Sequence, residues 1–506
     1  MNLAQLLCDS AQRVPASPAI VLGTEVLSTF GQLASQVSGR ASELVMKHRI
    51  QPGDRIAIFA SNSPEYLEIL FAIWWSGAVA IPLSSMLHAR EVATLLVDSA
   101  ARICIVSDDK VEELHAAIGG DCVVITVDEL LVGQITTTRP VDKSPDQAAW
   151  VFFTSGTTGR PKGALLSHHN LLAMTTAYLA DVEGVDERSG LLHLGLMSHA
   201  GGLFALPFVA RGAKQVIPES RSADVAEAWD LLGNHDRLSL FAPPILLRRL
   251  VAQAPADLVA VSRMGTVLVG AAPVLANDLI TGVEVFGPKV WNGYGQGETP
   301  CTITALNAAA IAKAVAINDL QTLRSVGYPR IGTEVRVVGA DDQELPNGEP
   351  GEIIVRGPTV MAGYLDRPDA NAETLRNGWL HTGDIGKFEN GLLTLLDRSK
   401  DLVITGGANV YPREVEDILI SHPSIADVAV IGIPDVEWGE RLVACIVPTD
   451  ATGISPDLLD EYCLAHIARY KRPKEYLVVD QLPRNGAGKV LKSELRATIV
   501  APSNKE

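Results

Sequence analysis

In the N-terminal part of the chain, short apolar runs alternate with segments whose apolar residues recur at helical spacing. Arg55–Phe59, Val79–Pro82 and Ala101–Val106 have the length and composition of buried strands, whereas Pro64–Trp75 and Ala89–Asp98 have those of helices. Alternation of helices with buried strands is typical of a parallel sheet that helices cover on both faces. The pattern therefore predicts an α/β fold.

The residues before this alternation predict a short helical and hairpin region. Leu3–Val14 has amphipathic helical spacing and stops at a proline, and Gln32–His48 is a second helical segment. Between them, Ala19–Val21 and Ser28–Phe30 predict a hairpin.

Chain length and composition limit the classes of protein. A chain of 506 residues is too long for one core, so at least two domains are expected. The net charge of −17 argues against nucleic-acid binding through a general basic surface. It does not exclude an anionic ligand, because local lysines and helix N-termini decide such binding.

The pattern of cysteines and apolar runs predicts a cytoplasmic protein. The six cysteines are scattered, with no CxxC pair, which favours ordinary reduced thiols. The N-terminus lacks the features of a signal peptide. The longest apolar run, Ile69–Leu83, is too short to span a bilayer and is interrupted by polar residues, glycine and proline. We interpret it as a buried helix followed by a buried strand, so no transmembrane segment is expected.

One stretch, Thr154–Gly163, reads Thr-Ser-Gly-Thr-Thr-Gly-Arg-Pro-Lys-Gly and follows the apolar strand Trp150–Phe153. Glycines allow backbone N–H groups to approach a polyanion, hydroxyls donate to its oxygens, and Lys162 supplies positive charge. The stretch is not a Walker P-loop, because Pro161 and Gly163 occupy positions where that motif needs glycine and a hydroxyl residue. A phosphate-binding loop is the first hypothesis, and a flexible surface turn is the alternative.

The loop resembles the phosphate-binding signature of the adenylate-forming superfamily, which contains acyl-CoA synthetases, adenylation domains of peptide synthetases, and luciferases. The resemblance extends over nearly the whole chain. It implies that ATP phosphates are bound by Thr154, Ser155, Gly156, Thr157, Thr158, Gly159 and Lys162.

Two further segments resemble pocket walls of that superfamily. His199, in Leu194–Leu203, takes the position beside the acyl carboxylate, although a lone histidine is more often structural than catalytic. Phe241–Pro244 and the small residues after the strand Val267–Val269 would let an adenine ring lie against backbone. A tight strand-to-helix turn is the alternative for those small residues, which are Gly270, Ala271, Ala272 and Pro273.

The segment Trp291–Thr299 resembles the Tyr-Gly-x-Thr-Glu motif. The resemblance places Tyr294 near the adenine and assigns Glu298 to Mg²⁺, which prefers carboxylate and phosphate oxygens. Gly297 replaces the usual threonine, a loss of about 1 kcal/mol if one hydrogen bond to the α-phosphate is missing. The neighbouring residues assigned to the nucleotide are Asn292, Gly293 and Gly295.

The C-terminal part carries the remaining motifs of the resemblance. Asp384 and Arg398 would bind the ribose hydroxyls, and Lys400 falls on the hinge position. We therefore expect a large domain over residues 1–397 and a small mobile α+β domain over residues 398–506. In the small domain, Gly406 and Gly407 would let the pantetheine arm of CoA pass close to the backbone. Lys489 would contact the carboxylate of the acid and the α-phosphate of ATP together. The basic cluster at residues 470–474 either meets the phosphates of CoA or is a solvated face.

These motifs imply a ligase that uses ATP, Mg²⁺ and coenzyme A. A carboxylic acid would be activated as acyl-AMP with release of pyrophosphate, and CoA would then take the acyl group. In acetate enzymes of the superfamily a tryptophan closes the acyl pocket at the position of Gly295. Gly295, together with the small residues Gly201, Gly202, Gly293 and Ala271, therefore implies a pocket deep enough for a medium- or long-chain fatty acid, with an aryl acid of the benzoate or cinnamate type as the alternative. Amino acids are disfavoured, because Met197–Ala200 contains no aspartate that could bind an amine.

Two other classes stay open at this point. The second step could instead be transfer to a carrier protein or oxidation of the adenylate, as in luciferases. The chain could also be a nucleotide-binding protein without activity, although the joint presence of Lys162, Glu298, Asp384, Arg398 and Lys489 argues against that. The sequence is silent on oligomeric state, and a homodimer stays open.

Overall fold

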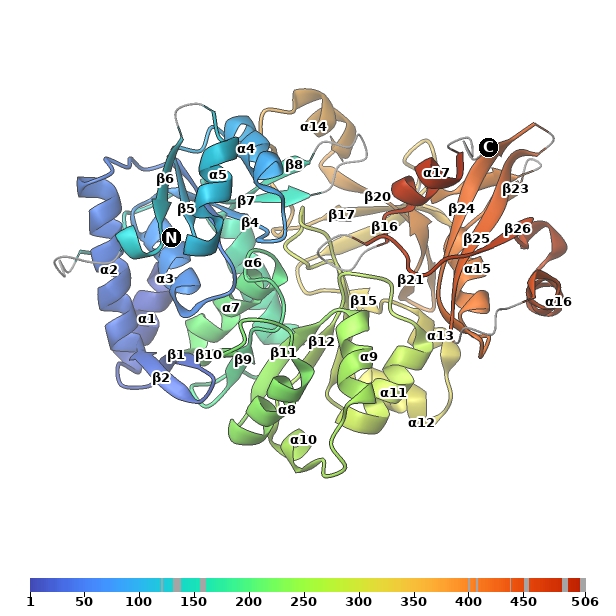
Figure 1. The fold of residues 1–506 in the computed structure, drawn as a ribbon, viewed down its shortest axis with the longest axis horizontal. Helices are drawn as coiled ribbons and strands as arrows, with labels where there is room; N and C mark the ends of the chain where they lie inside the picture. The colour runs from blue at the N-terminus through green and yellow to red at the C-terminus, as the bar shows by residue number, and fades with distance from the viewer. Residues whose placement is uncertain are drawn as a thin grey trace. The chain divides into compact units, whose positions relative to one another are not determined.

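The structure is a computed structural model of residues 1–506. It describes residues 1–119, 122–130, 138–154, 161–398, 401–405, 408–436, 438–449, 455–484 and 490–500. The chain divides into two compact units, drawn in Figure 1. The first comprises residues 1–335 and 355–380, and the second comprises residues 336–354 and 381–506.

In the first unit, the described residues form a seven-stranded sheet that carries the phosphate-loop strands. Its core strands β7, β4, β3, β5 and β6 are parallel, and β8 and β18 pair antiparallel at one edge. The order is β18 (Gly363–Tyr364), β8 (Lys162–Ser167), β7 (Ala148–Thr154), β4 (Val79–Leu83), β3 (Arg55–Phe59), β5 (Ile103–Val106) and β6 (Val123–Thr126).

A second sheet of the first unit has nine strands among the described residues. Its centre is parallel, and β2, β14 and β15 are antiparallel additions at its two edges. The order is β15 (Tyr328–Pro329), β14 (Thr304–Leu306), β13 (Val290–Tyr294), β12 (Val267–Val269), β11 (Leu238–Ala242), β9 (Gly190–Leu192), β10 (Lys214–Ile217), β1 (Pro18–Leu22) and β2 (Glu25–Thr29).

The helices of the first unit follow the predicted alternation closely. The predicted helices Pro64–Trp75 and Ala89–Asp98 are confirmed at their bounds, as α3 and α4. The other helices are α1 (Gln5–Arg13), α2 (Phe30–Met46), α5 (Val111–Ala117), α6 (His168–Asp181), α7 (Ala200–Arg211), α8 (Val225–Asn234), α9 (Pro244–Ala252), α10 (Val259–Arg263), α11 (Ala276–Phe286), α12 (Ala308–Ala316), α13 (Leu320–Arg324) and α14 (Pro368–Thr374). Every residue of helix α3 except Glu65 is buried, which explains why its sequence is apolar on nearly all sides.

A third sheet has five strands among the described residues. Its order is β16 (Glu334–Val338), β17 (Gly351–Arg356), β20 (Trp379–Glu389) and β19 (Leu375–Arg376), with β21 (Leu392–Arg398) paired to β20. The β20–β21 hairpin belongs mainly to the second unit and carries Asp384 and Arg398.

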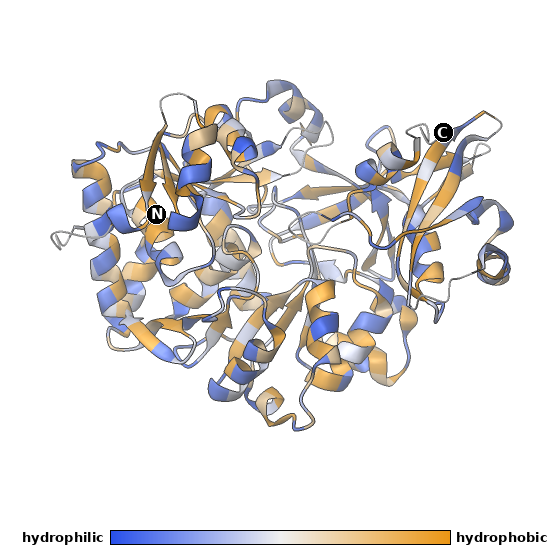
Figure 2. Ribbon diagram, viewed as in Figure 1, coloured by the Kyte–Doolittle hydropathy of each residue, from blue (hydrophilic) through white to orange (hydrophobic). Residues whose placement is uncertain are grey.

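The described residues of the second unit also form a five-stranded sheet. Strands β24 (Ile425–Asp435) and β25 (Gly439–Pro448) form its long antiparallel pair, and both carry hydrophobic colour in Figure 2. The other strands are β22 (Val403–Thr405), β23 (Ala408–Val410) and β26 (Glu475–Val478). The helices are α15 (Pro412–Leu419), α16 (Pro456–His466) and α17 (Lys492–Val500). The α+β character predicted for the C-terminal part is confirmed, whereas the hinge near residue 398 stays a prediction.

Within the described ranges, no helix is long and apolar enough to cross a membrane. The predicted buried helix and strand of Ile69–Leu83 are confirmed as the end of α3 and as β4.

Helices α2 and α3 are joined by a buried ion pair between Arg40 and Glu68. The guanidinium donates from Nε at 2.9 Å and from Nη2 at 2.5 Å to the same Glu68 oxygen. Burial raises the pKa of Glu68, and the charge of Arg40 opposes that shift. Both charged groups are removed from water, so loss of either partner leaves a buried, uncompensated charge and lowers the stability of the fold.

We predict that Glu68→Ala lowers the free energy of unfolding of the first unit by about 3–5 kcal/mol, because it leaves a buried, unpaired guanidinium. Urea unfolding measures the change. Asp236→Ala is the control: it breaks the exposed ion pair of Asp236 with Arg263 (2.6 Å) and should have a much smaller effect. Equal losses in the two variants would contradict the prediction.

Candidate active site

The predicted phosphate loop connects β7 and β8, two antiparallel neighbours. Residues 155–160, and with them Ser155, Gly156, Thr157, Thr158 and Gly159, lie outside the described residues. Both ends of the loop are described, because Thr154 and Lys162 are cross-strand partners. The loop therefore joins two strands, whereas ligand loops of open α/β sheets join a strand to a helix.

Glu298 is the centre of the candidate site in the first unit. Its carboxylate is nearly buried, with 7% of the residue exposed. The hydroxyl of Thr154 donates to Glu298 Oε1 at 2.9 Å, and the hydroxyl of Tyr364 donates to the same oxygen at 2.9 Å. Lys162 Nζ lies 5.1 Å from the centre of the Tyr364 ring. The structure thus brings together three residues predicted from sequence and one, Tyr364, that the sequence analysis missed.

The turn after Glu298 is tightly closed. The N–H groups of Thr299 and Cys301 both donate to Gln296 O, at 3.1 and 3.0 Å. Pro300 and Cys301 adopt positive φ angles of 20° and 57°. Burial, with the negative charge of Glu298, raises the pKa of the Cys301 thiol to about 12, so this thiol is neutral near pH 7. Strained backbone of this kind is concentrated at functional sites.

Gly297, which departs from the family motif, lies against β7. A Cβ atom there would stand 2.5 Å from Phe152 Cδ1 and 2.7 Å from Thr154 Cγ2. Phe152 and Thr154 are two residues apart in a strand and so project from the same face. Phe152 therefore occupies the space that a larger side chain at position 297 would need.

His199 precedes α7 and lies beside Phe152. The two rings are perpendicular, with centroids 5.5 Å apart, and His199 Nδ1 is 2.9 Å from Ser198 Oγ. Burial lowers the pKa of His199, so the imidazole is neutral at pH 7. A neutral ring can form a wall or a hydrogen bond, but it does not supply positive charge to an anion.

The predicted adenine wall lies where β12 and β13 end. A Cβ on Gly270 would stand 3.0 Å from Gly293 O, so these two backbone segments are in close contact. Ala271 has a φ of +68°, which is unusual for a residue with a side chain. Tyr294 and Asn292 are buried in β13, and Asn292 Oδ1 has no hydrogen-bond partner among the described residues. The small residues let a flat ring lie close to the backbone, and the unpaired Asn292 Oδ1 can accept a hydrogen bond from an amino group on such a ring.

Four glycines that the sequence analysis takes as signs of a deep acyl pocket have local structural reasons. A Cβ on Gly202 would stand 2.2 Å from Met197 O, and one on Gly201 would stand 2.8 Å from Leu196 O. A Cβ on Gly295 would stand 2.3 Å from the carbonyl carbon of Cys301, and one on Gly293 would stand 2.5 Å from the Trp291 ring. Their small size therefore gives no measure of pocket depth.

In the second unit, the structure brings Asp384 and Arg398 together. They are cross-strand partners in the β20–β21 hairpin, and Arg398 Nε is 3.0 Å from Asp384 Oδ1. Glu352, which the sequence analysis missed, accepts from His381 Nδ1 at 2.9 Å and from the Gly383 N–H at 3.1 Å. It thereby fixes the chain just before Asp384. A single acidic residue in the apolar strand Gly351–Arg356 is the sequence signal that could have revealed it.

The segment before the predicted hinge is anchored to α15. Asp397 accepts from the Arg398 N–H at 2.7 Å and from the Arg413 N–H at 3.1 Å. Burial raises the pKa of Asp397. Four residues with predicted roles lie outside the described residues: Lys400, Gly406, Gly407 and Lys489.

The predicted basic cluster is largely paired within the second unit. Lys471 Nζ binds both Glu414 oxygens, at 2.6 and 2.7 Å, and Arg472 binds Asp460 at 2.5 Å. Lys474 Nζ lies 4.7 Å from the centre of the Trp438 ring. Charges already paired in this way are poorer candidates for the phosphates of CoA than free lysines.

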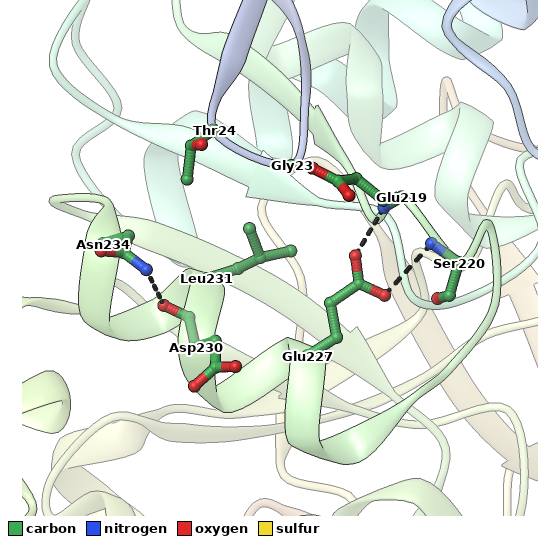
Figure 3. Close-up of a pocket in the computed structure, with 8 residues that line it drawn as sticks. All are labelled: Gly23, Thr24, Glu219, Ser220, Glu227, Asp230, Leu231 and Asn234. Atoms are coloured by element: carbon green, nitrogen blue, oxygen red, sulfur yellow. Dashed lines mark hydrogen bonds between the residues drawn. The ribbon is translucent and has the colours of Figure 1, made fainter.

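A cavity of about 360 Å³ lies elsewhere in the first unit, between the β1–β2 turn and α8 (Figure 3). Its lining is acidic, and Glu227 in it accepts from the N–H groups of Glu219 and Ser220 (Figure 3). None of the predicted site residues lies in this lining.

Comparison with known proteins decides the family. The model of the AMP-binding enzyme family matches residues 7–365, and the model of its C-terminal domain matches residues 414–489. The chain belongs to the AMP-binding enzyme family. The predicted membership of the adenylate-forming superfamily, in its acyl-CoA synthetase branch, is confirmed.

Two curated relatives and one solved structure illustrate the similarity. The chain is 35% identical to the feruloyl-CoA synthase of an Amycolatopsis species, over 96% of each chain. It is 31% identical to the fatty acid–[acyl-carrier-protein] ligase ScoC of Streptomyces coeruleorubidus, over 98% of this chain and 96% of that one. The ATP-bound crystal structure of MatB from Rhodopseudomonas palustris has a TM-score of 0.88 at 28% identity, and the match covers 98% of this chain and 99% of that one.

These similarities confirm the predicted class of enzyme. This AMP-binding enzyme is an acid–thiol ligase of the AMP-forming, acyl-CoA synthetase type, and its cofactors are ATP, Mg²⁺ and CoA. The residues of the candidate site suit Mg²⁺, because Glu298 offers one carboxylate, and Mg²⁺ completes its shell with phosphate oxygens and water.

We predict that Gly297→Thr lowers the free energy of unfolding of this enzyme by about 1–3 kcal/mol, because the new side chain overlaps Phe152. Adding Phe152→Val should recover part of the loss, and urea unfolding of both single variants and the double variant measures the coupling. Gly184→Thr is the control, since a Cβ there meets no atom within 4 Å. Additive effects at positions 297 and 152 would contradict the prediction.

Proposed function

We propose that this enzyme activates an aromatic carboxylic acid as an acyl-adenylate and transfers the acyl group to CoA. The observation that supports the aromatic substrate is the perpendicular contact of Phe152 with the neutral ring of His199, beside Gly297 and the Glu298 turn. Aromatic rings favour such edge-to-face partners, so an aryl group can extend this arrangement. Similarity to a feruloyl-CoA synthase points the same way.

The first step brings two anions together, so the site has to neutralise charge. In this proposal Lys162 binds phosphate oxygens, Glu298 holds Mg²⁺, and Thr154 orients the Glu298 carboxylate through its 2.9 Å hydrogen bond. Mg²⁺, when bound, neutralises phosphate charge and orients pyrophosphate as a leaving group. His199 and Phe152 form the wall beside the acyl group.

The second unit supplies the remaining groups of the proposal. Asp384 accepts hydrogen bonds from the ribose hydroxyls, and Arg398 orients its carboxylate through their 3.0 Å contact. Lys489 assists adenylate formation. Movement about Lys400, at the boundary between domains 1–397 and 398–506, then exchanges Lys489 for Gly406 and Gly407, which admit the CoA thiol. We also propose a cytoplasmic location.

A medium- or long-chain fatty acid is the second candidate substrate. Similarity to a ligase that joins fatty acids to an acyl carrier protein favours it, and the same likeness keeps a carrier protein open as the acceptor. The glycines that first favoured a fatty acid carry less weight, because their Cβ directions are blocked by nearby atoms.

The decisive experiment measures ATP- and Mg²⁺-dependent pyrophosphate release with a panel of acids, with and without CoA. The panel is ferulate, cinnamate, benzoate, octanoate, palmitate and two amino acids. We expect aryl acids to give the highest kcat/KM and CoA to be required for AMP release. A preference for octanoate or palmitate would establish the second candidate, and AMP release that needs a carrier protein in place of CoA would replace the proposed acceptor.

We further predict that Asp384→Asn raises the KM for ATP about tenfold or more, because an amide is a weaker acceptor than a carboxylate for the ribose hydroxyls. The measurement is pyrophosphate release with ATP and with 2′,3′-dideoxy-ATP. The wild type should discriminate against the dideoxy nucleotide and the variant should discriminate less. Asp435→Asn, in the same unit at the end of β24, is the control. Unchanged discrimination in Asp384→Asn would remove Asp384 from the nucleotide site.

A further inference from the structure

The backbone around Tyr364 is held in place from two sides. Strand β18 pairs with β8, so that Tyr364 faces Ala164, and the N–H of Leu365 donates to Gly163 O at 2.8 Å. On the other side, Asn371 accepts from the Tyr364 N–H and donates to Tyr364 O at 3.0 Å. The main chain at Tyr364 is therefore held by hydrogen bonds that do not depend on the Tyr364 side chain.

The segment that carries Tyr364 is also bonded to the Glu298 turn. The Met361 N–H donates to Glu298 O at 2.8 Å. Backbone and side chain of Glu298 are thus both bonded to residues 361–364, while Thr154 bonds the carboxylate from β7. Two separate parts of the sequence therefore bond the carboxylate that a third part carries.

The hydrogen bonds to the carboxylate are asymmetric. Within the described part of the chain, both hydroxyl donors reach Oε1 of Glu298. Two donors on one oxygen fix the plane of the carboxylate and leave the acceptor capacity of Oε2 for a cation.

The Tyr364 side chain contacts both Glu298 and Lys162. Lys162 Nζ lies 5.1 Å from the ring centre, and no ion pair joins Lys162 to Glu298 in the described structure. A direct pair between them would neutralise both charges, one needed for a divalent cation and the other for phosphate. An ammonium over an aromatic face keeps its charge and still gains attraction from the ring.

We propose that Tyr364 is a positioning residue that orients the Glu298 carboxylate toward a divalent cation and holds the Lys162 ammonium away from it, toward the polyphosphate. This inference rests on the proposed roles of Glu298 and Lys162. It assigns two separable tasks to one side chain: the hydroxyl acts on Glu298, and the ring acts on Lys162.

The test separates the two tasks with two substitutions. Tyr364→Phe keeps the ring and removes the hydroxyl, so we expect the Mg²⁺ concentration for half-maximal pyrophosphate release to rise about tenfold, with little change in the KM for ATP at saturating Mg²⁺. Tyr364→Leu removes both, so the KM for ATP should rise as well. Calorimetric titration with ATP in the absence of any acid, at low and high Mg²⁺, gives the same comparison without turnover.

The chain offers a matched control. Tyr178 is fully buried, and its hydroxyl donates to Glu183 Oε1 at 2.9 Å, so Tyr178→Phe removes the same kind of bond elsewhere in the same unit. The control should leave the Mg²⁺ dependence unchanged. Tyr364→Phe in a Glu298→Gln background should add no further shift, because the carboxylate is already absent.

The outcomes distinguish this inference from the proposed function. A shift in Mg²⁺ dependence confined to Tyr364→Phe supports positioning. Equal behaviour of Tyr364→Phe and Tyr178→Phe, or a full additional shift in the Glu298→Gln background, overturns it and leaves the ligase function intact. If the wild type released no pyrophosphate with any acid, the proposed function would fail, and the calorimetric comparison would still decide the inference.

Discussion

A buried carboxylate needs partners, and the candidate site is organised around that requirement. Glu298 is almost withdrawn from water, and a carboxylate in that position is stable only if its oxygens are hydrogen-bonded or bound to a cation. Thr154 and Tyr364 satisfy one oxygen. The other oxygen is then available to bind a cation. The need to give this buried carboxylate partners therefore shapes the fold and also prepares a site for a cation.

The strands around Glu298 explain why distant residues meet there. The antiparallel pairing of β7 and β8 places Lys162 opposite Thr154, and β18 adds Tyr364 at the edge of the same sheet. The turn after β13 brings Glu298 to this edge and is held by hydrogen bonds from Thr299 and Cys301 to Gln296 O. Parallel strands supply the rigid core, and the antiparallel strands at the edge position the charged side chains.

Gly297 shows how a departure from a family motif can be accommodated. The motif expects threonine there, and the loss of a hydroxyl suggests a weakened site when the sequence is considered alone. In the structure, Phe152 fills the space and contacts His199, so the change replaces a polar group with an aromatic surface next to Glu298. Such an exchange alters the apolar part of the site and leaves the carboxylate of Glu298 in place.

The sequence by itself determined the elements and the family. The bounds of α3 and α4 follow from local patterns of apolar residues and prolines, which depend on near neighbours in the chain. The motifs with Thr154, Lys162, Glu298, Asp384 and Arg398 identified the class of enzyme, because they resemble the motifs of the adenylate-forming superfamily. Only the tertiary structure revealed Tyr364 and Glu352, and it showed that the glycines around His199 and Tyr294 meet backbone or ring atoms. These facts depend on contacts between residues far apart in the chain, and no local pattern encodes such contacts.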